Sequence, residues 1–106
     1  MKRDVFQGIA DPTRREILVL LTSEPMTPNT LAEQFRTSRQ AVSKHIQVLA
    51  ECQLLKQQKQ GREIYYHLNA KKLKEVEKWL DQFRGQVEEH TTLLDRVLQN
   101  FMSSAK

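Results

Sequence analysis

The feature that most constrains this fold is a pair of predicted helices joined by only three residues. The first is about eight residues long and begins at Thr27-Pro28, a capping residue followed by proline at the first helical position. The second follows Arg36-Thr37-Ser38 and extends from about Ser38, its cap, to Cys52. Apolar residues keep helical spacing in both: Leu31, Ala32 and Phe35, then Ala41, Val42, Ile46, Leu49 and Ala50. Two helices connected in this way are typical of a helix-turn-helix.

Two further helices are expected before this pair. Residues Val5, Phe6 and Ile9 mark a short amphipathic helix. Asp11-Pro12 then supplies a second cap followed by proline, which starts the next helix. That helix should end near Ser23-Glu24-Pro25 and turn four aliphatic residues inward: Ile17, Leu18, Leu20 and Leu21.

The hydrophobic period changes after the second helix of the pair. A polar, extended stretch follows Leu54-Leu55 and reaches Gly61, which can supply the positive φ of a hairpin turn. The next residues alternate, with Ile64, Tyr66 and Leu68 on one face and Glu63, Tyr65 and His67 on the other. A hairpin in this position is the wing of a winged helix-turn-helix. The predicted fold is therefore mainly α with a small β-hairpin, with a winged helix-turn-helix domain over residues 1–69.

Residues 70–106 predict a long C-terminal helix that mediates dimerisation. Apolar residues recur in steps of three and four for about four heptads, at Leu73, Val76, Leu80, Phe83, Val87, Leu94, Val97 and Phe101, with His90 among them. Trp79, Leu93 and Leu98 widen this stripe. We expect a homodimer with an interface formed by this segment and the first helix: Val5, Phe6, Ile9, Leu73, Val76, Leu80, Phe83, Val87, Leu94 and Val97. The alternative is that part of the segment folds back onto its own domain.

Positive charge is concentrated in the predicted helix-turn-helix and wing. The chain carries a formal charge of +4. Residues 36–62 alone hold six basic residues against one acid, a net +5, so the remainder sums to −1. A local excess of this kind is expected of a surface that binds a polyanion. On charge alone, a solvated basic surface without a partner fits equally well.

The exposed face predicted for the second helix of the pair carries side chains suited to DNA bases. Arg39 and Lys44 can bond guanine, Gln40 can bond adenine, and Ser43 can bond either. Recognition helices contact base edges through their first turns, although a polar helix surface without a ligand is the alternative. Five further residues are predicted to hold phosphate: Thr37, Ser38, Lys59, Gln60 and Arg62. For Lys59 and Arg62, which flank the wing tip, contact with the minor groove is the alternative. The expected partner is double-stranded DNA.

Three stretches of the sequence are specific in combination: IADPTRREILVLL, the segment LAEQF–TSRQAVSKHIQVLAECQLL, and GREIYYHL. Together, over residues 5–68, they resemble the ArsR/SmtB family of bacterial winged-helix repressors. The resemblance implies a dimer, a palindromic operator and repression, often of the protein's own gene. It also places Arg39, Gln40, Ser43 and Lys44 at the family's usual contact positions. One departure is Gln53, where relatives usually have a glycine that ends the recognition helix, so a different helix end is expected.

Many members of that family release DNA on binding a metal, but the ligands for a metal are missing from this sequence. Metal-sensing members carry cysteines on the third helix or an Asp/His set on the last. Here the third helix, TPNTLAEQF, has no cysteine, and His45, Cys52 and His67 are scattered on other elements. A transition metal needs about three or more clustered ligands. We expect no metal and no cofactor, so a small molecule, a partner protein or concentration alone would set DNA occupancy.

Three residues have two interpretations each. His45 faces either DNA or the third helix, and Cys52 either fills the core or acts as a thiol switch, which needs exposure and a lowered pKa. His90 is either a plain helical histidine or a group whose protonation strains the dimer.

The remaining function classes are constrained by what the sequence lacks. A single cysteine suits a reducing compartment, and no apolar run is long enough to span a bilayer, so we expect a cytoplasmic protein without membrane association. No Gly-rich phosphate loop or catalytic motif is present, so the chain is not expected to be an enzyme. The competing function is a winged-helix protein-interaction module without DNA binding.

Overall fold

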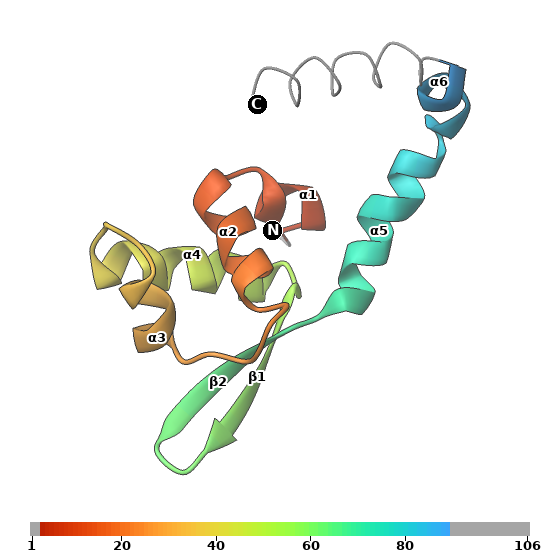
Figure 1. Ribbon diagram of the computed structural model, residues 1–106. Coiled ribbons are helices and arrows are strands. Elements are labelled where there is room, and N and C mark those ends of the chain that lie inside the picture. Colours follow the sequence, from red (N-terminus) through yellow and green to blue (C-terminus); the bar gives the residue numbers. More distant parts are fainter. Residues whose placement is uncertain (1–2, 90–106) are drawn as a thin grey trace, which may run out of the picture. The chain divides into compact units, whose positions relative to one another are not determined.

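The structure is a computed structural model that describes residues 3–89 (Figure 1). The elements are α1 (Val5–Ile9), α2 (Pro12–Leu20), α3 (Pro28–Glu33), α4 (Arg39–Glu51), β1 (Leu55–Gln60), β2 (Glu63–Leu68), α5 (Ala70–Asp81) and α6 (Arg84–Glu89). The chain divides into two compact units, Met1–Val76 and Glu77–Lys106, and the boundary falls within α5. The first unit is a mainly helical domain with one antiparallel hairpin, as expected for a winged helix-turn-helix.

Side-chain caps start the helices of the first unit. Asp11, Thr27 and Ser38 each accept a hydrogen bond from the backbone N–H three residues later, at 3.1, 3.2 and 3.1 Å. These bonds satisfy N–H groups that have no partner within the helix. The three predicted caps are therefore confirmed. The start of α1 is also capped, by a reciprocal capping box between Asp4 and Gln7 that was not predicted.

One hydrophobic core holds α1 to α4 and the base of the hairpin together. Its buried members are Val5, Ile17, Leu18, Leu21, Leu31, Val42, Ile46, Leu49, Cys52, Leu54 and Leu55. The first helix contributes Val5 to this core, whereas Phe6 remains exposed. Leu20, which was expected to face inward, is half-buried at the end of α2.

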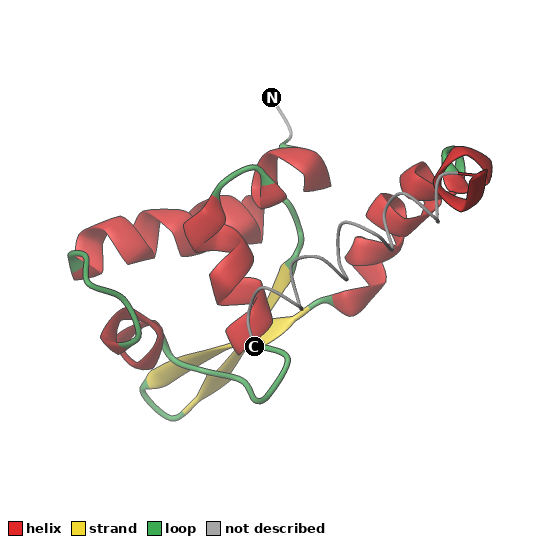
Figure 2. Ribbon diagram, turned by 45° about the horizontal axis from the view of Figure 1, so that its top comes forward, coloured by secondary structure: helices red, strands yellow, loops and turns green. Residues whose placement is uncertain are grey.

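The hairpin projects from the helices as a wing (Figure 2). Its strands pair from Leu55 opposite Leu68 at the base to Gln60 opposite Glu63 at the tip, and Gly61 makes the turn with φ +64°. Near the tip Ile64 is 40% exposed, whereas Tyr66 on the same face is half-buried beside the helices. Tyr66 also pairs with Met26 through two backbone hydrogen bonds of 3.2 and 2.8 Å. The wing is thus attached to the segment that leads into α3.

α4 ends in the way that a glycine would allow, although the residue there is Gln53. Its φ is +64°, in the left-handed region that side chains disfavour. Leu54 N–H bonds the carbonyl of Leu49, and Gln53 N–H bonds that of Ala50, both at 3.0 Å. This pair of bonds is the Schellman arrangement. The expectation of a different helix end is therefore wrong, because the glutamine adopts the glycine conformation.

The described part of the C-terminal segment is not one continuous helix. α5 ends at Asp81 and α6 begins at Arg84. Between them, Gln82 and Phe83 form short-range backbone bonds to Trp79 and Leu80 in place of the α-helical pattern. The side chain of Val87 and residues 90–106, with His90, Leu94, Val97 and Phe101, lie outside the described residues.

Candidate nucleic-acid interface

α4 presents one apolar and one polar face. Val42, Ile46 and Leu49 are buried in the core, which fixes the rotation of the helix about its axis. The residues predicted to contact bases lie on the remaining surface, and all of them are exposed: Arg39, Gln40, Ser43 and Lys44. Arg39, Gln40 and Ser43 together line a shallow depression of about 350 Å³. The structure thus brings these three side chains to one place at the N-terminal end of α4.

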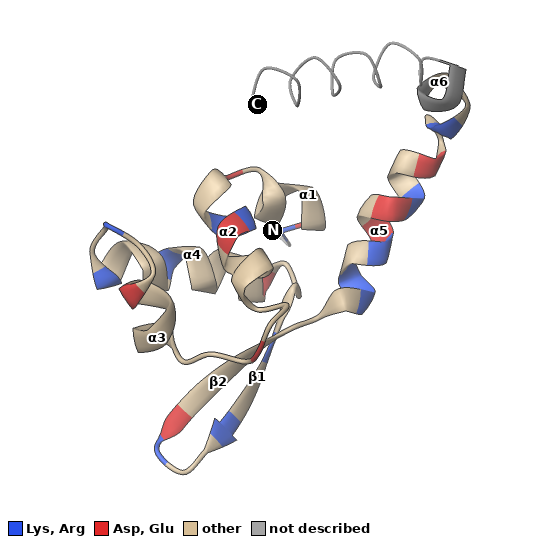
Figure 3. Cartoon of the chain, viewed as in Figure 1, with Lys and Arg blue, Asp and Glu red and all other residues tan. Residues whose placement is uncertain are grey.

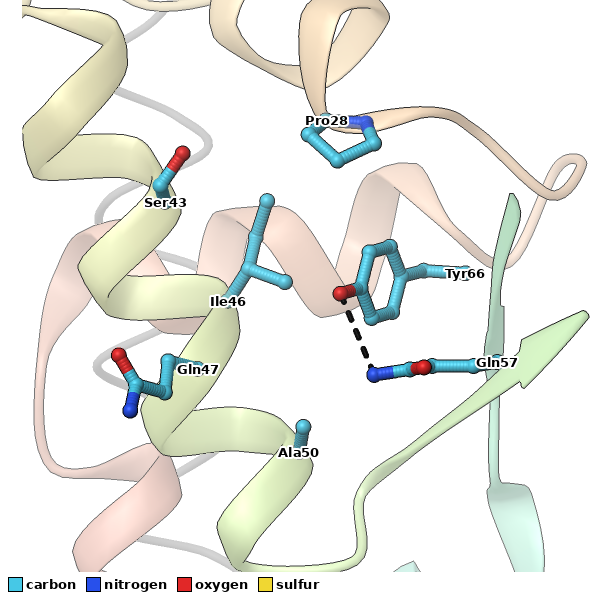
Figure 4. A pocket seen from close by; sticks show the side chains of 7 residues that line it. All are labelled: Pro28, Ser43, Ile46, Gln47, Ala50, Gln57 and Tyr66. Carbon is cyan, nitrogen blue, oxygen red and sulfur yellow. Dashed lines mark hydrogen bonds between the residues drawn. The ribbon is translucent and has the colours of Figure 1, made fainter. Parts of the chain in front are cut away.

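A second, smaller cavity lies where α4 meets the wing (Figure 4). Its volume is about 150 Å³, and it is lined by Pro28, Ser43, Ile46, Gln47, Ala50, Gln57 and Tyr66. In Figure 4 the Tyr66 ring extends from the wing towards α4, where Gln57 Nε2 donates a hydrogen bond of 3.4 Å to its hydroxyl. This cavity could not be predicted from the sequence, because its position depends on the register of the hairpin. Ser43 belongs to both hollows.

The predicted phosphate-binding residues occupy two places. Thr37 and Ser38 are exposed immediately before α4, while Lys59, Gln60 and Arg62 are exposed at the end of the wing, where Figure 3 shows basic residues beside one acidic segment. Within residues 3–89, neither these cations nor Arg36, Arg39 and Lys44 form an ion pair. Their positive charges are therefore not neutralised by neighbouring carboxylates in this part of the chain.

A cluster of polar contacts around Arg14 joins α4 to α1 and α2. The Arg14 guanidinium donates to the carbonyls of Gly8 and Gln7, at 2.9 and 3.0 Å, and lies 3.2 Å from His45 Nδ1. Asp11 lies 3.8 Å from the same imidazole. His45 is half-buried and contacts Arg14 and Asp11 at the start of α2, a position that neither of its two interpretations named. The cluster links α1, α2 and the recognition helix, and sequence analysis missed the contribution of Arg14.

Cys52 caps the C-terminal end of α4 and is completely buried. Burial raises the pKa of its thiol, although the charges of Arg3 and Arg14 act in the opposite direction. Both observations favour packing in the core over a thiol switch. No cluster of three or more His, Cys, Asp or Glu side chains suited to a metal occurs among residues 3–89.

The residues predicted for the dimer interface differ in exposure. Val5 is 1% exposed and belongs to the hydrophobic core of the first unit. Ile9, Leu73 and Val76 are half-buried against that core. Phe6, Leu80 and Phe83 are exposed, as is Trp79, whose ring meets that of Phe83 edge to face with centroids 5.0 Å apart. None of the helices in the described range is both long and apolar enough to cross a bilayer.

Comparison with known proteins agrees with this architecture. A family model described as a helix-turn-helix domain matches residues 9–58. The transcriptional repressor SdpR of Bacillus subtilis is 38% identical over 80 residues, which cover 76% of this chain and 89% of the repressor. A solved structure of a possible transcriptional regulator for arsenical resistance is 37% identical, with a TM-score of 0.70, over 92% of this chain and 96% of that one. A solved ArsR family regulator is 34% identical, with a TM-score of 0.70, over 78% of this chain and 91% of that one.

These relatives are transcriptional regulators rather than enzymes, and the likeness extends over most of each protein. The shared region contains the helix-turn-helix, whose exposed helix is α4 in this chain. The chain belongs to the ArsR/SmtB family of winged-helix proteins and is a DNA-binding transcriptional regulator.

Proposed function

We propose that the chain is a homodimeric repressor that inserts α4 into the major groove of a palindromic operator. The observation that carries the proposal is the N-terminal half of α4, where Arg39, Gln40, Ser43 and Lys44 are exposed on a helix held in place by its buried side. Their donors and acceptors match the edges of guanine and adenine in the major groove. Acidic or apolar side chains, expected of a protein-interaction module, do not occur at these positions.

Phosphate contacts would position this helix on the duplex. Thr37 and Ser38 precede α4, and Lys59, Gln60 and Arg62 extend the surface to the end of the wing. The unpaired cations among them can replace the counterions that DNA releases on binding. Affinity should therefore fall steeply as salt concentration rises, with each neutralised phosphate contributing about −0.9 to the log–log slope.

The test of the DNA-binding surface begins with duplexes selected by the protein from a random library. Arg39→Ala should weaken binding to the selected duplex by about 1–3 kcal/mol and relax the preference at one base pair. Lys59→Ala, the matched control, should weaken binding to all duplexes alike and reduce the salt slope by about 0.9. An equal loss on selected and unselected duplexes for Arg39→Ala would remove its role in base recognition.

The homodimer is proposed from the exposed apolar residues Phe6, Leu80 and Phe83, with Ile9, Leu73 and Val76 beside the core. The interface would extend to Val87, Leu94 and Val97. Sedimentation should find a dimer at the concentrations at which the protein binds DNA. Leu80→Glu should shift it towards monomer, whereas Lys78→Glu on the same helix should not. A wild-type monomer bound to DNA would contradict the proposal.

A palindromic operator would give a footprint with two protected regions about 34 Å apart, one helical turn, because a symmetric dimer presents two copies of α4. Repression of the chain's own gene requires that the DNA upstream of that gene compete with the selected duplex. If that fragment does not compete while the selected duplex binds fully, the protein does not repress its own gene and the proposal holds only for other targets.

A further inference from the structure

The cavity between α4 and the wing lies beside the proposed base-contacting surface and is connected to it through Ser43, which lines both hollows. Its walls combine an apolar floor with side-chain hydroxyl and amide groups from Ser43, Gln47, Gln57 and Tyr66. No carboxylate and no cation lines it. Its chemistry is thus that of neutral hydrogen-bond donors in a partly enclosed space.

Tyr66 is the donor best placed to serve a ligand. Its hydroxyl accepts a long hydrogen bond of 3.4 Å from Gln57 Nε2, and its own proton has no acceptor among residues 3–89. The residue is also held in position, because its backbone pairs with Met26 on one side and faces Gln57 across the hairpin on the other. A donor that is already in place loses little conformational entropy when a ligand binds.

The size of the cavity indicates the class of occupant. A volume of about 150 Å³ is half of the about 300 Å³ at which small-molecule sites begin. It suits one phosphate group better than an organic effector. Hydroxyl and amide side chains of Ser, Gln and Tyr are ordinary phosphate contacts in protein–DNA complexes.

We propose that this cavity receives one backbone phosphate of the DNA strand that passes between α4 and the wing, with the Tyr66 hydroxyl as its main donor. The inference rests on the proposed function, since it needs DNA on this face of the domain. It adds Tyr66 and Gln57 to the contacts predicted from the sequence. Because both side chains are neutral, their contacts strengthen binding without releasing counterions.

Tyr66→Phe in the full chain tests this inference, because the change removes the hydroxyl and keeps the ring. On a duplex selected by the wild-type protein, we expect affinity to fall about 10- to 150-fold, as for a lost hydrogen bond to a charged group, with an unchanged salt slope. Tyr65→Phe is the matched control. Its hydroxyl bonds Glu63 at 3.2 Å and does not line the cavity, so its affinity should match that of the wild type.

A second measurement identifies the phosphate. The phosphates of the duplex are replaced one at a time by methylphosphonate. One of these replacements should lower the DNA affinity of the wild type but should not lower the affinity of Tyr66→Phe any further. Thermal unfolding should show both Tyr variants folded as well as the wild type, since the Tyr66 hydroxyl has only one long bond in the described residues.

The outcomes separate the two proposals. A wild-type protein that binds no duplex overturns the proposed function. If the wild type binds the selected duplex and Tyr66→Phe binds it with the same affinity, only the proposed phosphate contact is overturned. A third outcome is that millimolar inorganic phosphate stabilises the wild type but not Tyr66→Phe, while no methylphosphonate in the duplex weakens binding. This outcome would assign the cavity to a free anion and would also overturn the inference.

Discussion

Gln53 stores strain at the junction between the recognition helix and the wing, and its replacement by glycine should stabilise the protein. A residue with a side chain loses about 1–2 kcal/mol in the left-handed conformation that Gln53 adopts at φ +64°. Glycine avoids that cost but loses about 0.5–1 kcal/mol more conformational entropy on folding. The difference predicts that Gln53→Gly raises the free energy of unfolding by about 0.5–1 kcal/mol.

Thermal and urea unfolding at one protein concentration would measure the gain. For a domain of this size, such a change corresponds to an increase in Tm of about 2–8 °C. The effect is attributable to the backbone, because the Gln53 side chain is exposed and the hydrogen bond from Asn69 Nδ2, 2.8 Å long, goes to the Gln53 carbonyl, which glycine retains.

Gln53→Ala is the matched control, since it removes the same side chain and keeps the left-handed penalty. Its stability should remain close to that of the wild type. If Gln53→Gly and Gln53→Ala were equally stable, or if glycine were destabilising, the argument from backbone strain would be refuted. The helix end would then owe its conformation to the two bonds from Asn69 to Gln53 and Leu54.

Three further predictions concern other positions in the first unit. Gly8→Ala should cost about 1–3 kcal/mol in urea unfolding, because the added Cβ would lie 2.6 Å from Leu54 Cδ1, an atom in the buried core. Asp11→Ala should cost about 1 kcal/mol at neutral pH through loss of the α2 cap. Although burial acts to raise the pKa of Asp11, the N–H of Arg14 and the charge of His45 lower it overall from 3.8. The carboxylate's contribution is therefore complete above pH 3.8 and disappears as the pH falls through the lowered value, so unfolding curves in acid should show a smaller gap between variant and wild type. Cys52 should react with iodoacetamide much more slowly in the native protein than in urea, since it is buried and burial raises its pKa; equal rates would contradict the structure.

The parts of the fold that could be predicted depend on local signals. Asp11, Thr27 and Ser38 are recognisable because a helix cap bonds an N–H only three residues away. The buried stripe of α4 is equally local, since it follows from a period of 3.6 residues. The rotation of α4, and with it the exposure of Arg39 and Gln40, was therefore predictable from the sequence.

Long-range features escaped the same reasoning. Periodicity shows which residues share a face but not whether the helix continues, so the interruption at Gln82 and Phe83 went unpredicted. The cavity at Tyr66 requires the strand register and the pairing with Met26, which join segments far apart in the chain. The Arg14 cluster likewise depends on the packing of α1 against α2 and α4.

The structural elements that hold α4 in place are separate from the four side chains proposed to contact bases, although one of them, Ser38, also belongs to the proposed phosphate contacts. Its start is capped by Ser38, its buried side is held by the core, and its far end is tied to the wing through Asn69. Within the described residues, no acidic side chain pairs with Arg39 or Lys44. Stability and DNA affinity should consequently respond to different residues, with changes at Gln53 or Gly8 altering unfolding and changes at Arg39, Lys59 or Tyr66 altering binding.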